Sequence, residues 1–371
     1  MMKKVGIITF HNSYNCGSML ESYAMQTAIE KIGKSAEIIN FSNLGQRELY
    51  SEMYKNNSFK NIIKNIIIFP HRGRIKYNNS KYEEFKNKYF KLTKDYDNIN
   101  ELDDSSYSTV VSGSDQIWNV TIADADDAYF LPWVKKAKKV AYAPSFGSKN
   151  ILKYSNNPDK YKKYILNYDA VSIRENNGKK WLKDLCNIDV DVLLDPTLLL
   201  EKKDYECLEA SDFEFHDDYI FFYSPGFDRK ICKFVKQIAD KYNLKVITWS
   251  AKQYYTKMIK SFGFELSKYE NPSMYLSLIK NSKLIMTTSY HGTIFSTIYK
   301  KNFIVIKNGG MYGDDDRVKT LLNQLCMESR LIPYNFDDNF NYMENVDYTN
   351  YDNKIKLLRE KSLNFLEENV K

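Results

Sequence analysis

Four segments of the sequence place small, polar or charged residues directly after an apolar stretch, where parallel α/β enzymes hold their reactive groups. They are Asn12–Ser18, Ser112–Asn119, Ser172–Glu175 and Thr287–Thr293. The fourth contains His291, and a histidine at the start of a helix can serve as a general acid or base near neutral pH. Its small neighbours Ser289 and Gly292 leave room for a ligand. A purely structural histidine is the alternative interpretation.

The first segment could bind an anion. Asn15, Cys16, Gly17 and Ser18 lead into a helical pattern, and the N–H groups and dipole of a helix N-terminus favour negative charge. The segment lacks the lysine and the spacing of a P-loop. An ordinary connecting loop is therefore the alternative.

The second and third segments offer groups for hydroxyls and for anions. Ser114, Asp115 and Gln116 follow a strand pattern and could orient sugar hydroxyls. The alternative is an Asx turn in which Trp118 fills the core. Arg174 stands at a strand end, where its planar guanidinium can hold a phosphate or carboxylate through two hydrogen bonds. A surface ion pair is the alternative for this arginine.

The elements that must position these segments form two α/β series. Short apolar, β-branched runs alternate with amphipathic helical patterns, which is typical of a parallel, doubly wound sheet. The expected strands are residues 5–10, 37–40, 109–111, 139–142, 170–172, 190–194, 218–223, 245–249, 283–287 and 303–306. The expected helices include residues 19–32, 229–242, 272–281 and 354–368, and one that starts near residue 294.

The length of 371 residues favours two lobes over one core. We expect an N-terminal lobe at residues 1–200 with a basic, mostly helical insertion near 46–96, and a C-terminal lobe at 201–335. A polar linker and a final helix would follow at 336–371. The predicted fold class is α/β, with two Rossmann-like lobes built on parallel sheets.

Composition narrows the function classes. Hydrophobic residues make up 43% and charged residues 27% of the chain, as in ordinary globular proteins. The five cysteines show no CxxC spacing and the four histidines no metal-ligand spacing, so we expect free thiols and no metal. No apolar run is long enough to cross a bilayer, and the first residues lack a signal-peptide layout. We therefore expect a cytoplasmic location.

Five motifs, taken in order, are similar to those of the polysaccharide pyruvyl transferase family. They are Ser112–Trp118, Ala143–Gly147, Ser172–Glu175, Asp195–Leu198 and Ser289–Gly292. The opening strand and Asn15–Ser18 agree as well, so the resemblance covers residues 5–317. It implies a GT-B-like fold with the site in the cleft between the lobes. It also implies transfer of a pyruvyl group from phosphoenolpyruvate to sugar hydroxyls as a ketal, without a cofactor, on a cell-surface polysaccharide or its lipid-linked precursor.

The same resemblance implies roles for individual residues. His291 and Arg174 would be the catalytic residues, with His291 moving protons and Arg174 holding the anionic donor. The predicted substrate-binding residues are Asn15, Cys16, Gly17, Ser18, Ser114, Asp115, Gln116, Ser289, Gly292, Lys307 and Arg317. Many family members have an acid directly before Ser-x-His-Gly, whereas this chain has Thr288, so the group that orients His291 is left open.

Two other functions are compatible with the same fold. One is a glycosyltransferase of the GT-B type with a nucleotide-sugar donor, although no clear signature of a base and ribose pocket is present. The other is a noncatalytic sugar-binding relative. Binding of phosphoenolpyruvate or of a nucleotide sugar separates these classes.

The net charge of +7 is concentrated in one stretch, because residues 55–94 hold 11 Lys and Arg against two acids. A helix at residues 60–69 would gather Ile62, Ile63, Ile66 and Ile67 on one face. The cations in its company are Lys60, Lys64, Arg72 and Arg74. This pattern favours peripheral contact of residues 60–76 with an anionic membrane. The alternative is a helix packed on the first lobe, and no nucleic-acid partner is expected because no nucleic-acid motif accompanies the charge.

Overall fold

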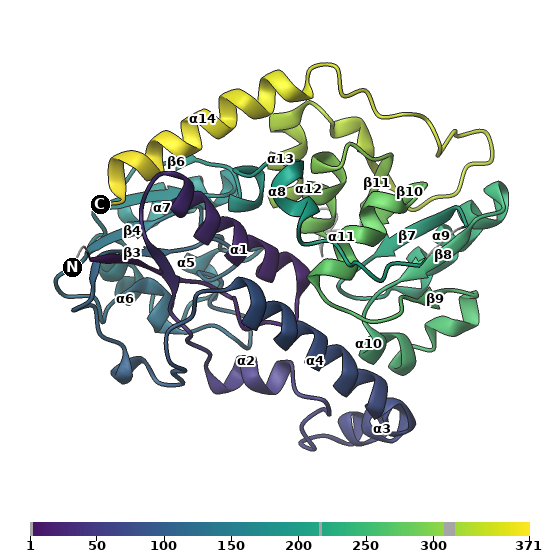
Figure 1. Ribbon diagram of the computed structural model, residues 1–371, viewed down its shortest axis with the longest axis horizontal. Coiled ribbons are helices and arrows are strands. Elements are labelled where there is room, and N and C mark those ends of the chain that lie inside the picture. Colours follow the sequence, from purple (N-terminus) through teal and green to yellow (C-terminus); the bar gives the residue numbers. More distant parts are fainter. Residues whose placement is uncertain (1–2, 215–216, 308–315) are drawn as a thin grey trace. The chain divides into compact units, whose positions relative to one another are not determined.

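The computed structural model describes residues 3–214, 217–307 and 316–371, which form two compact units. The first unit consists of residues 1–50, 86–200 and 353–371, and the second of residues 51–85 and 201–352. Each unit contains one six-stranded sheet whose paired strands all run parallel. The predicted class, α/β with two Rossmann-like parallel sheets, is confirmed (Figure 1).

The sheet of the first unit has the strand order β2-β1-β3-β4-β5-β6. Its strands are β1 (Lys4–Ile8), β2 (Ala36–Ile38), β3 (Tyr107–Ser112), β4 (Lys138–Ala141), β5 (Ala170–Ile173) and β6 (Asp191–Val192). Its helices are α1 (Cys16–Lys31), α2 (Leu44–Leu49), α5 (Ile151–Tyr154), α6 (Pro158–Ile165), α7 (Asn176–Cys186) and α14 (Tyr351–Asn369), of which the last begins two residues before the unit.

The sheet of the second unit has the order β12-β11-β10-β7-β8-β9. Its strands are β7 (Tyr219–Tyr223), β8 (Lys245–Thr248), β9 (Glu265–Leu266), β10 (Leu284–Thr287), β11 (Phe303–Lys307) and β12 (Leu331–Pro333). Its helices are α3 (Phe59–Ile68), most of α4 (Arg72–Tyr89), α8 (Lys202–Glu206), α9 (Arg229–Tyr242), α10 (Ala251–Thr256), α11 (Pro272–Asn281), α12 (Tyr290–Ile298) and α13 (Asp316–Leu325).

Local sequence signals set several helix ends where they were predicted. The Asp228 side chain accepts hydrogen bonds from the N–H groups of Lys230 and Ile231 at the start of α9. Pro272 occupies the first turn of α11 behind the cap of Asn271. These two helices have the predicted bounds, because a cap and the helical periodicity act over a few residues.

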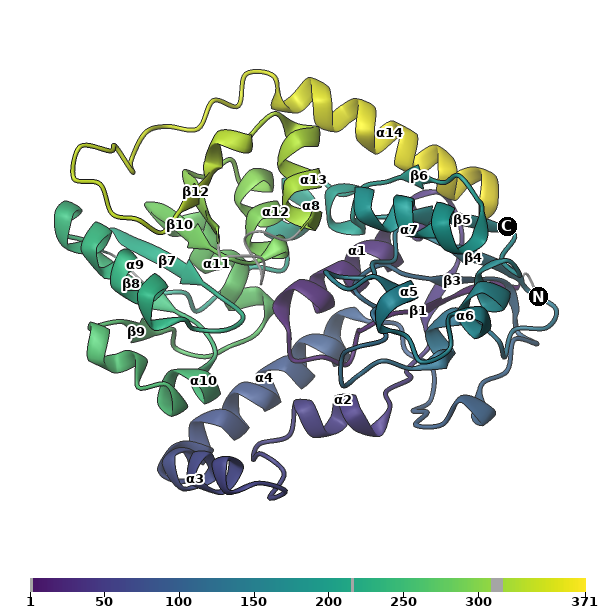
Figure 2. The same ribbon diagram turned by 180° about the vertical axis from the view of Figure 1, so that it is seen from behind.

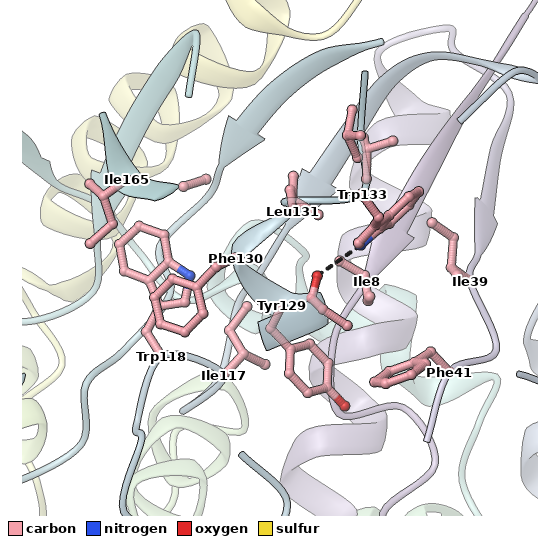
Figure 3. Packing of buried hydrophobic residues seen from close by; sticks show 14 of the residues in the cluster. Ile8, Ile39, Phe41, Ile117, Trp118, Tyr129, Phe130, Leu131, Trp133 and Ile165 are labelled. Atoms are coloured by element: carbon pink, nitrogen blue, oxygen red, sulfur yellow. Dashed lines mark hydrogen bonds between the residues drawn. The ribbon is translucent and has the colours of Figure 1, made fainter. Parts of the chain in front are cut away.

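The hydrophobic core of the first unit includes side chains from the segment between β3 and β4. Trp118 is completely buried, and its ring stacks on Phe130 with centroids 5.4 Å apart (Figure 3). The indole N–H of Trp133 donates to the carbonyl of Ala128 over 2.9 Å, so this buried polar atom has its partner. Tyr129 packs edge-on against Phe41 in the same cluster.

Two segments differ from the expected organisation. The insertion was placed in the N-terminal lobe, whereas residues 51–85 group with the second unit. The final helix was expected after the second lobe, whereas residues 353–371 group with the first, where the backbone N–H of Lys371 donates to the hydroxyl of Thr109 over 3.1 Å. Figure 2 shows α14 beside β6 and the C-terminus near β3.

Some predicted element bounds also differ. α12 begins at Tyr290, not near residue 294, so His291 lies inside its first turn. α1 begins at Cys16, not at residue 19, because Asn15 caps it. Among the described residues, none of the helices combines the length and apolar character that crossing a bilayer requires.

Candidate functional site

Both sheets contain a topological switch point. At such a point the chain has added strands first on one side of a starting strand and then on its other side. In the first sheet β1 lies between β2 and β3, and in the second sheet β7 lies between β8 and β10. The loops at the carboxyl ends of such a strand pair diverge and leave a crevice, which is where α/β proteins bind ligands. The segments predicted at residues 12–18 and 112–119 follow β1 and β3, and the segment at 287–293 follows β10.

At the first switch point, the N-terminus of α1 meets the loop after β3. The Asn15 side chain caps the helix by accepting from the N–H of Gly17 over 2.9 Å. One turn further, the hydroxyl of Ser18 donates to Asp115 Oδ2 over 2.5 Å. The structure therefore brings these two predicted segments together, with a carboxylate held at the start of the helix.

The loop after β3 approaches its surroundings too closely for most side chains. A Cβ atom on Gly113 would lie 2.1 Å from the carbonyl oxygen of Tyr142, and Gly113 has a φ of +135°. Only glycine fits this position. Asp115 follows with a φ of 65°, and Gln116 accepts from the Asn119 side chain over 3.2 Å. The loop thus has one fixed path, which directs Asp115 towards α1.

Arg174 is buried in an ion-pair cluster. Its side chain is 0% exposed and donates from Nη1 to Asp195 Oδ2 over 2.7 Å. Its Nη2 atom lies 3.5 Å from Asp115 Oδ1. The guanidinium group that we expected to hold a substrate anion therefore binds two carboxylates of the protein. Asp195 also accepts hydrogen bonds from the hydroxyl and the backbone N–H of Thr197.

Sequence reasoning missed Glu21, a third carboxyl group of this cluster. It is completely buried in α1 and accepts from the N–H of Ser114 over 2.6 Å and from the Thr9 hydroxyl over 2.9 Å. Burial, and then the negative charges of Asp195 and Asp115, raise its pKa well above the usual value. Its spacing of four residues from the buried Met25 was the available signal, because both must share one helix face.

A fourth carboxyl group, Asp124, was also missed. It is 6% exposed, and burial together with the charge of Asp115 raises its pKa to about 6. A carboxyl group with this pKa can exchange a proton near neutral pH. It lies in an irregular loop without a motif, so no local pattern indicated it.

At the second switch point, Ser289 caps α12 and fixes the turn that carries His291. The Ser289 hydroxyl accepts from the N–H of Gly292 over 3.3 Å. The backbone N–H of Ser289 donates to the Thr287 hydroxyl over 3.0 Å. His291 is 7% exposed, and its ring centroid lies 5.4 Å from that of Tyr290. A Cβ atom on Gly292 would lie 2.3 Å from the Thr287 hydroxyl. The histidine is thus held by a turn that tolerates no larger residue at Gly292.

Thr288, which directly precedes Ser289, connects the two sides of this switch point. Its hydroxyl lies 2.9 Å from that of Ser224, in the loop after β7. Its backbone N–H donates to the carbonyl of Tyr223 over 3.3 Å. The position therefore joins the loops after β7 and β10 by neutral hydrogen bonds.

The two predicted cations of the second unit differ in burial. Arg317 is 7% exposed, and its guanidinium lies 5.9 Å from the centroid of the Tyr290 ring, on the same turn as His291. Lys307 is exposed at the end of β11, the neighbour of β10. Arg317 is thus placed beside the α12 turn, while Lys307 lies at the same edge of the sheet.

Within the described ranges, no group of three or more His, Cys, Asp or Glu side chains is placed to hold a metal ion. The carboxylates of the first unit have an arginine, hydroxyls and backbone N–H groups as their partners. The first unit thus offers side chains that can bind hydroxyls, and the second unit, separately, carries His291 at the start of α12.

Comparison with known proteins places these motifs in a family. A model of the family described as polysaccharide pyruvyl transferase matches residues 15–310. The sequence matches no curated protein.

Solved structures of similar fold include sugar-nucleotide epimerases. A UDP-N-acetylglucosamine 2-epimerase from Rickettsia bellii has 11% identity and a TM-score of 0.51, with 99% of this chain and 96% of that chain covered. A putative UDP-N-acetylglucosamine 2-epimerase from Listeria monocytogenes has 9% identity and a TM-score of 0.50, with 100% and 92% covered. At these identities the likeness shows the fold alone, which is GT-B-like as predicted.

Proposed function

Because the chain belongs to the polysaccharide pyruvyl transferase family, we propose that it transfers a pyruvyl group from phosphoenolpyruvate to hydroxyls of a sugar. The acceptor would belong to a cell-surface polysaccharide or its lipid-linked precursor, and the product would be a pyruvate ketal. The observation that supports this proposal best is the turn Ser289–Gly292. It holds the family's histidine, His291, in the first turn of α12 at a switch point of the sheet.

The proposed reaction needs one proton donor and two sugar hydroxyls. A proton added to the methylene carbon of phosphoenolpyruvate leaves positive charge on the carbon that bears the phosphate, and the first hydroxyl attacks there. The bond from this carbon to the phosphate oxygen then breaks, and the second hydroxyl closes the ketal. One of the two hydroxyl protons replaces the proton that the donor gave to the new methyl group, and the other leaves with the phosphate. We assign the first proton transfer to His291.

The donor's phosphate and carboxylate need cations and N–H donors. We propose that Arg317 and Lys307 of the second unit supply this positive charge. Arg174 becomes a positioning residue in this proposal, because its guanidinium is bound to Asp195 and Asp115. Asp115 and Gln116 are the candidates for the sugar hydroxyls.

Ligand-dependent thermal unfolding tests the donor assignment. Phosphoenolpyruvate at about 100 times its dissociation constant should stabilise the protein by about 2.7 kcal/mol, whereas pyruvate at equal concentration should not. Stabilisation by nucleotide sugars and not by phosphoenolpyruvate would replace the proposal with glycosyl transfer. Stabilisation by acceptor sugars alone would indicate a noncatalytic sugar-binding protein.

Substitution of His291 tests the assigned proton transfer. His291→Gln should retain the thermal shift with phosphoenolpyruvate and lower the rate of phosphate release in the presence of acceptor by about 10²- to 10⁴-fold. His71→Gln is the control. His71 belongs to the same unit, but its ring stacks on that of Tyr255, with centroids 3.6 Å apart, and it is not part of the α12 turn. Equal rates for the two variants would exclude His291 as the proton donor.

A further inference from the structure

α3 packs on the second unit by its polar side and exposes its apolar side. Asn65 is 9% exposed and exchanges two hydrogen bonds with the backbone of Tyr54, each of 2.8 Å. Ile68 on the same side is completely buried. A helix of a globular protein normally buries its apolar face, so this arrangement is reversed.

The exposed face of α3 forms a continuous apolar patch, which we call the α3 patch. Its members are Phe59 (77% exposed), Ile62 (42%), Ile63 (43%), Ile66 (67%), Ile67 (38%) and, just after the helix, Phe69 (57%). The five members inside the helix share about 140° of its circumference at 100° per residue. Single exposed hydrophobic residues are ordinary, but a contiguous patch of six marks an interaction surface.

Contacts beneath the α3 patch attach it to the rest of the second unit. His71 stacks on Tyr255 with ring planes 3° apart, and the Nζ atom of Lys252 in α10 donates to the carbonyl of Ser51 over 2.7 Å. Further along α4, the indole of Trp249 donates to the hydroxyl of Tyr82 over 3.3 Å. Both ribbon views show α3 beside α10 (Figures 1 and 2). These contacts join the segment that carries the α3 patch to α10 and to the loop after β8.

The chain segment that contains the α3 patch carries charge of a single sign. Residues 55–82 contain seven Lys or Arg and no Asp or Glu. Lys60 is exposed along one border of the patch, as are Arg72 and Lys76 just beyond it. Burial, and to a smaller extent the neighbouring charge of Lys64, lowers the pKa of Lys252 to about 8.

We propose that the α3 patch docks on the surface of an anionic phospholipid membrane, with its apolar residues between the headgroups and its cations on the phosphates. Apolar side chains flanked by Lys and Arg are what such a surface binds. A second copy of the chain is a poorer occupant, because a two-fold contact would oppose Lys60, Lys64 and Arg72 with their own copies. The inference goes beyond the proposed function and rests on it in one consequence only, namely access to a lipid-linked acceptor.

Vesicle flotation of the full chain tests the proposal without any substrate. The protein should float with phosphatidylcholine vesicles that contain phosphatidylglycerol, and not with phosphatidylcholine alone. The double variants Phe59→Ser/Ile66→Ser and Lys60→Glu/Lys64→Glu should each weaken this binding by at least about tenfold. The thermal midpoint of Phe59→Ser/Ile66→Ser should not fall, because both side chains are exposed.

Matched controls come from exposed residues on other helices. Leu357 in α14 is 67% exposed, as Ile66 is, so Leu357→Ser should float like the unmodified protein. Lys233→Glu/Lys356→Glu makes the same change of charge on exposed positions of α9 and α14 and should also leave binding unchanged.

Three results would overturn the proposal. They are absence of flotation with anionic vesicles, equal loss in the control and patch variants, and a dimer in solution that only Phe59→Ser/Ile66→Ser converts to a monomer. None of them depends on phosphoenolpyruvate. The thermal-shift test of the donor assignment and the flotation test of membrane docking can therefore fail independently of each other.

Discussion

At the scale of single residues, the carboxylate cluster of the first unit depends on Arg174. Replacing it with Met would leave Asp195 and Asp115 buried beside Glu21 without a positive charge. We expect Arg174→Met to lower the free energy of unfolding by about 3 to 5 kcal/mol, measured by urea denaturation.

An exposed ion pair of the same unit provides the control for Arg174. Arg47 lies 2.8 Å from Asp95, but the two side chains are 39% and 55% exposed. Arg47→Met should cost less than about 1 kcal/mol. Equal losses of unfolding free energy in Arg174→Met and Arg47→Met would contradict the role assigned to burial. The double variant Arg174→Met/Asp195→Asn should be more stable than Arg174→Met alone, because it also removes a buried negative charge.

Glu270 predicts a pH dependence of stability in the second unit. It is 7% exposed and accepts from the N–H of Ala251 over 2.6 Å, and burial raises its pKa from 4.5 to about 7. Between these values the unfolded carboxyl is ionised while the folded one keeps its proton. The stability it contributes is therefore complete below pH 4.5 and is lost as the pH rises towards 7.

Glu270→Gln removes the titratable carboxyl group and keeps a side-chain oxygen that can accept from the N–H of Ala251. At pH 8 the variant should be more stable than the unmodified protein by up to about 3 kcal/mol, and the advantage should vanish near pH 4.5. Thermal midpoints measured across this pH range check the prediction. The exposed Glu265→Gln in β9 is the control, and parallel curves for all three proteins would refute it.

At the scale of the element, the turn into α12 has no space for a side chain at Gly292. Gly292→Ala would press its methyl group against the Thr287 hydroxyl, 2.3 Å away. We expect a loss of about 1 to 3 kcal/mol in the free energy of unfolding, together with lower transferase activity, because the same turn holds His291.

Gly73 in α4 is the matched control, since a Cβ atom there would meet nothing within 4 Å. Gly73→Ala should stabilise the protein by up to about 1 kcal/mol through the higher helix propensity of alanine. Chemical denaturation of both variants measures the contrast. A stabilising Gly292→Ala would show that the turn relaxes freely.

At the scale of the whole molecule, both units are assembled from distant parts of the chain. In α14, the Ser362 hydroxyl accepts from the N–H of Leu194 over 3.1 Å, and Arg359 donates to the carbonyl of Leu198 over 2.9 Å. Leu366 is completely buried. The last helix is thus part of the first unit's core.

Leu366→Ala should therefore destabilise the first unit by about 2 to 5 kcal/mol. Hydrogen exchange should show faster exchange at β3 to β6 and little change at β7 to β11. Leu357→Ala, on the exposed face of the same helix, should stay within about 0.5 kcal/mol. Equal acceleration in both sheets after Leu366→Ala would contradict the division into two units.

The sequence by itself determined most of the elements and their order, but the short edge strands β9 and β12 were not predicted. Strands such as β10 and helices such as α9 and α11 follow from apolar periodicity and caps, which act within a few residues. The segments of the candidate sites were also evident, because parallel α/β folds place polar loops after their strands. What these loops contact was not evident.

Only the tertiary structure decided the partners. It placed Glu21 beside Asp115, gave Arg174 to Asp195, joined residues 51–85 to the second unit and turned the apolar face of α3 outwards. The physical reason is range. Periodicity and capping are properties of neighbouring residues, whereas ion pairs and packing join residues tens to hundreds of positions apart, and their energies depend on burial that exists only in the folded chain.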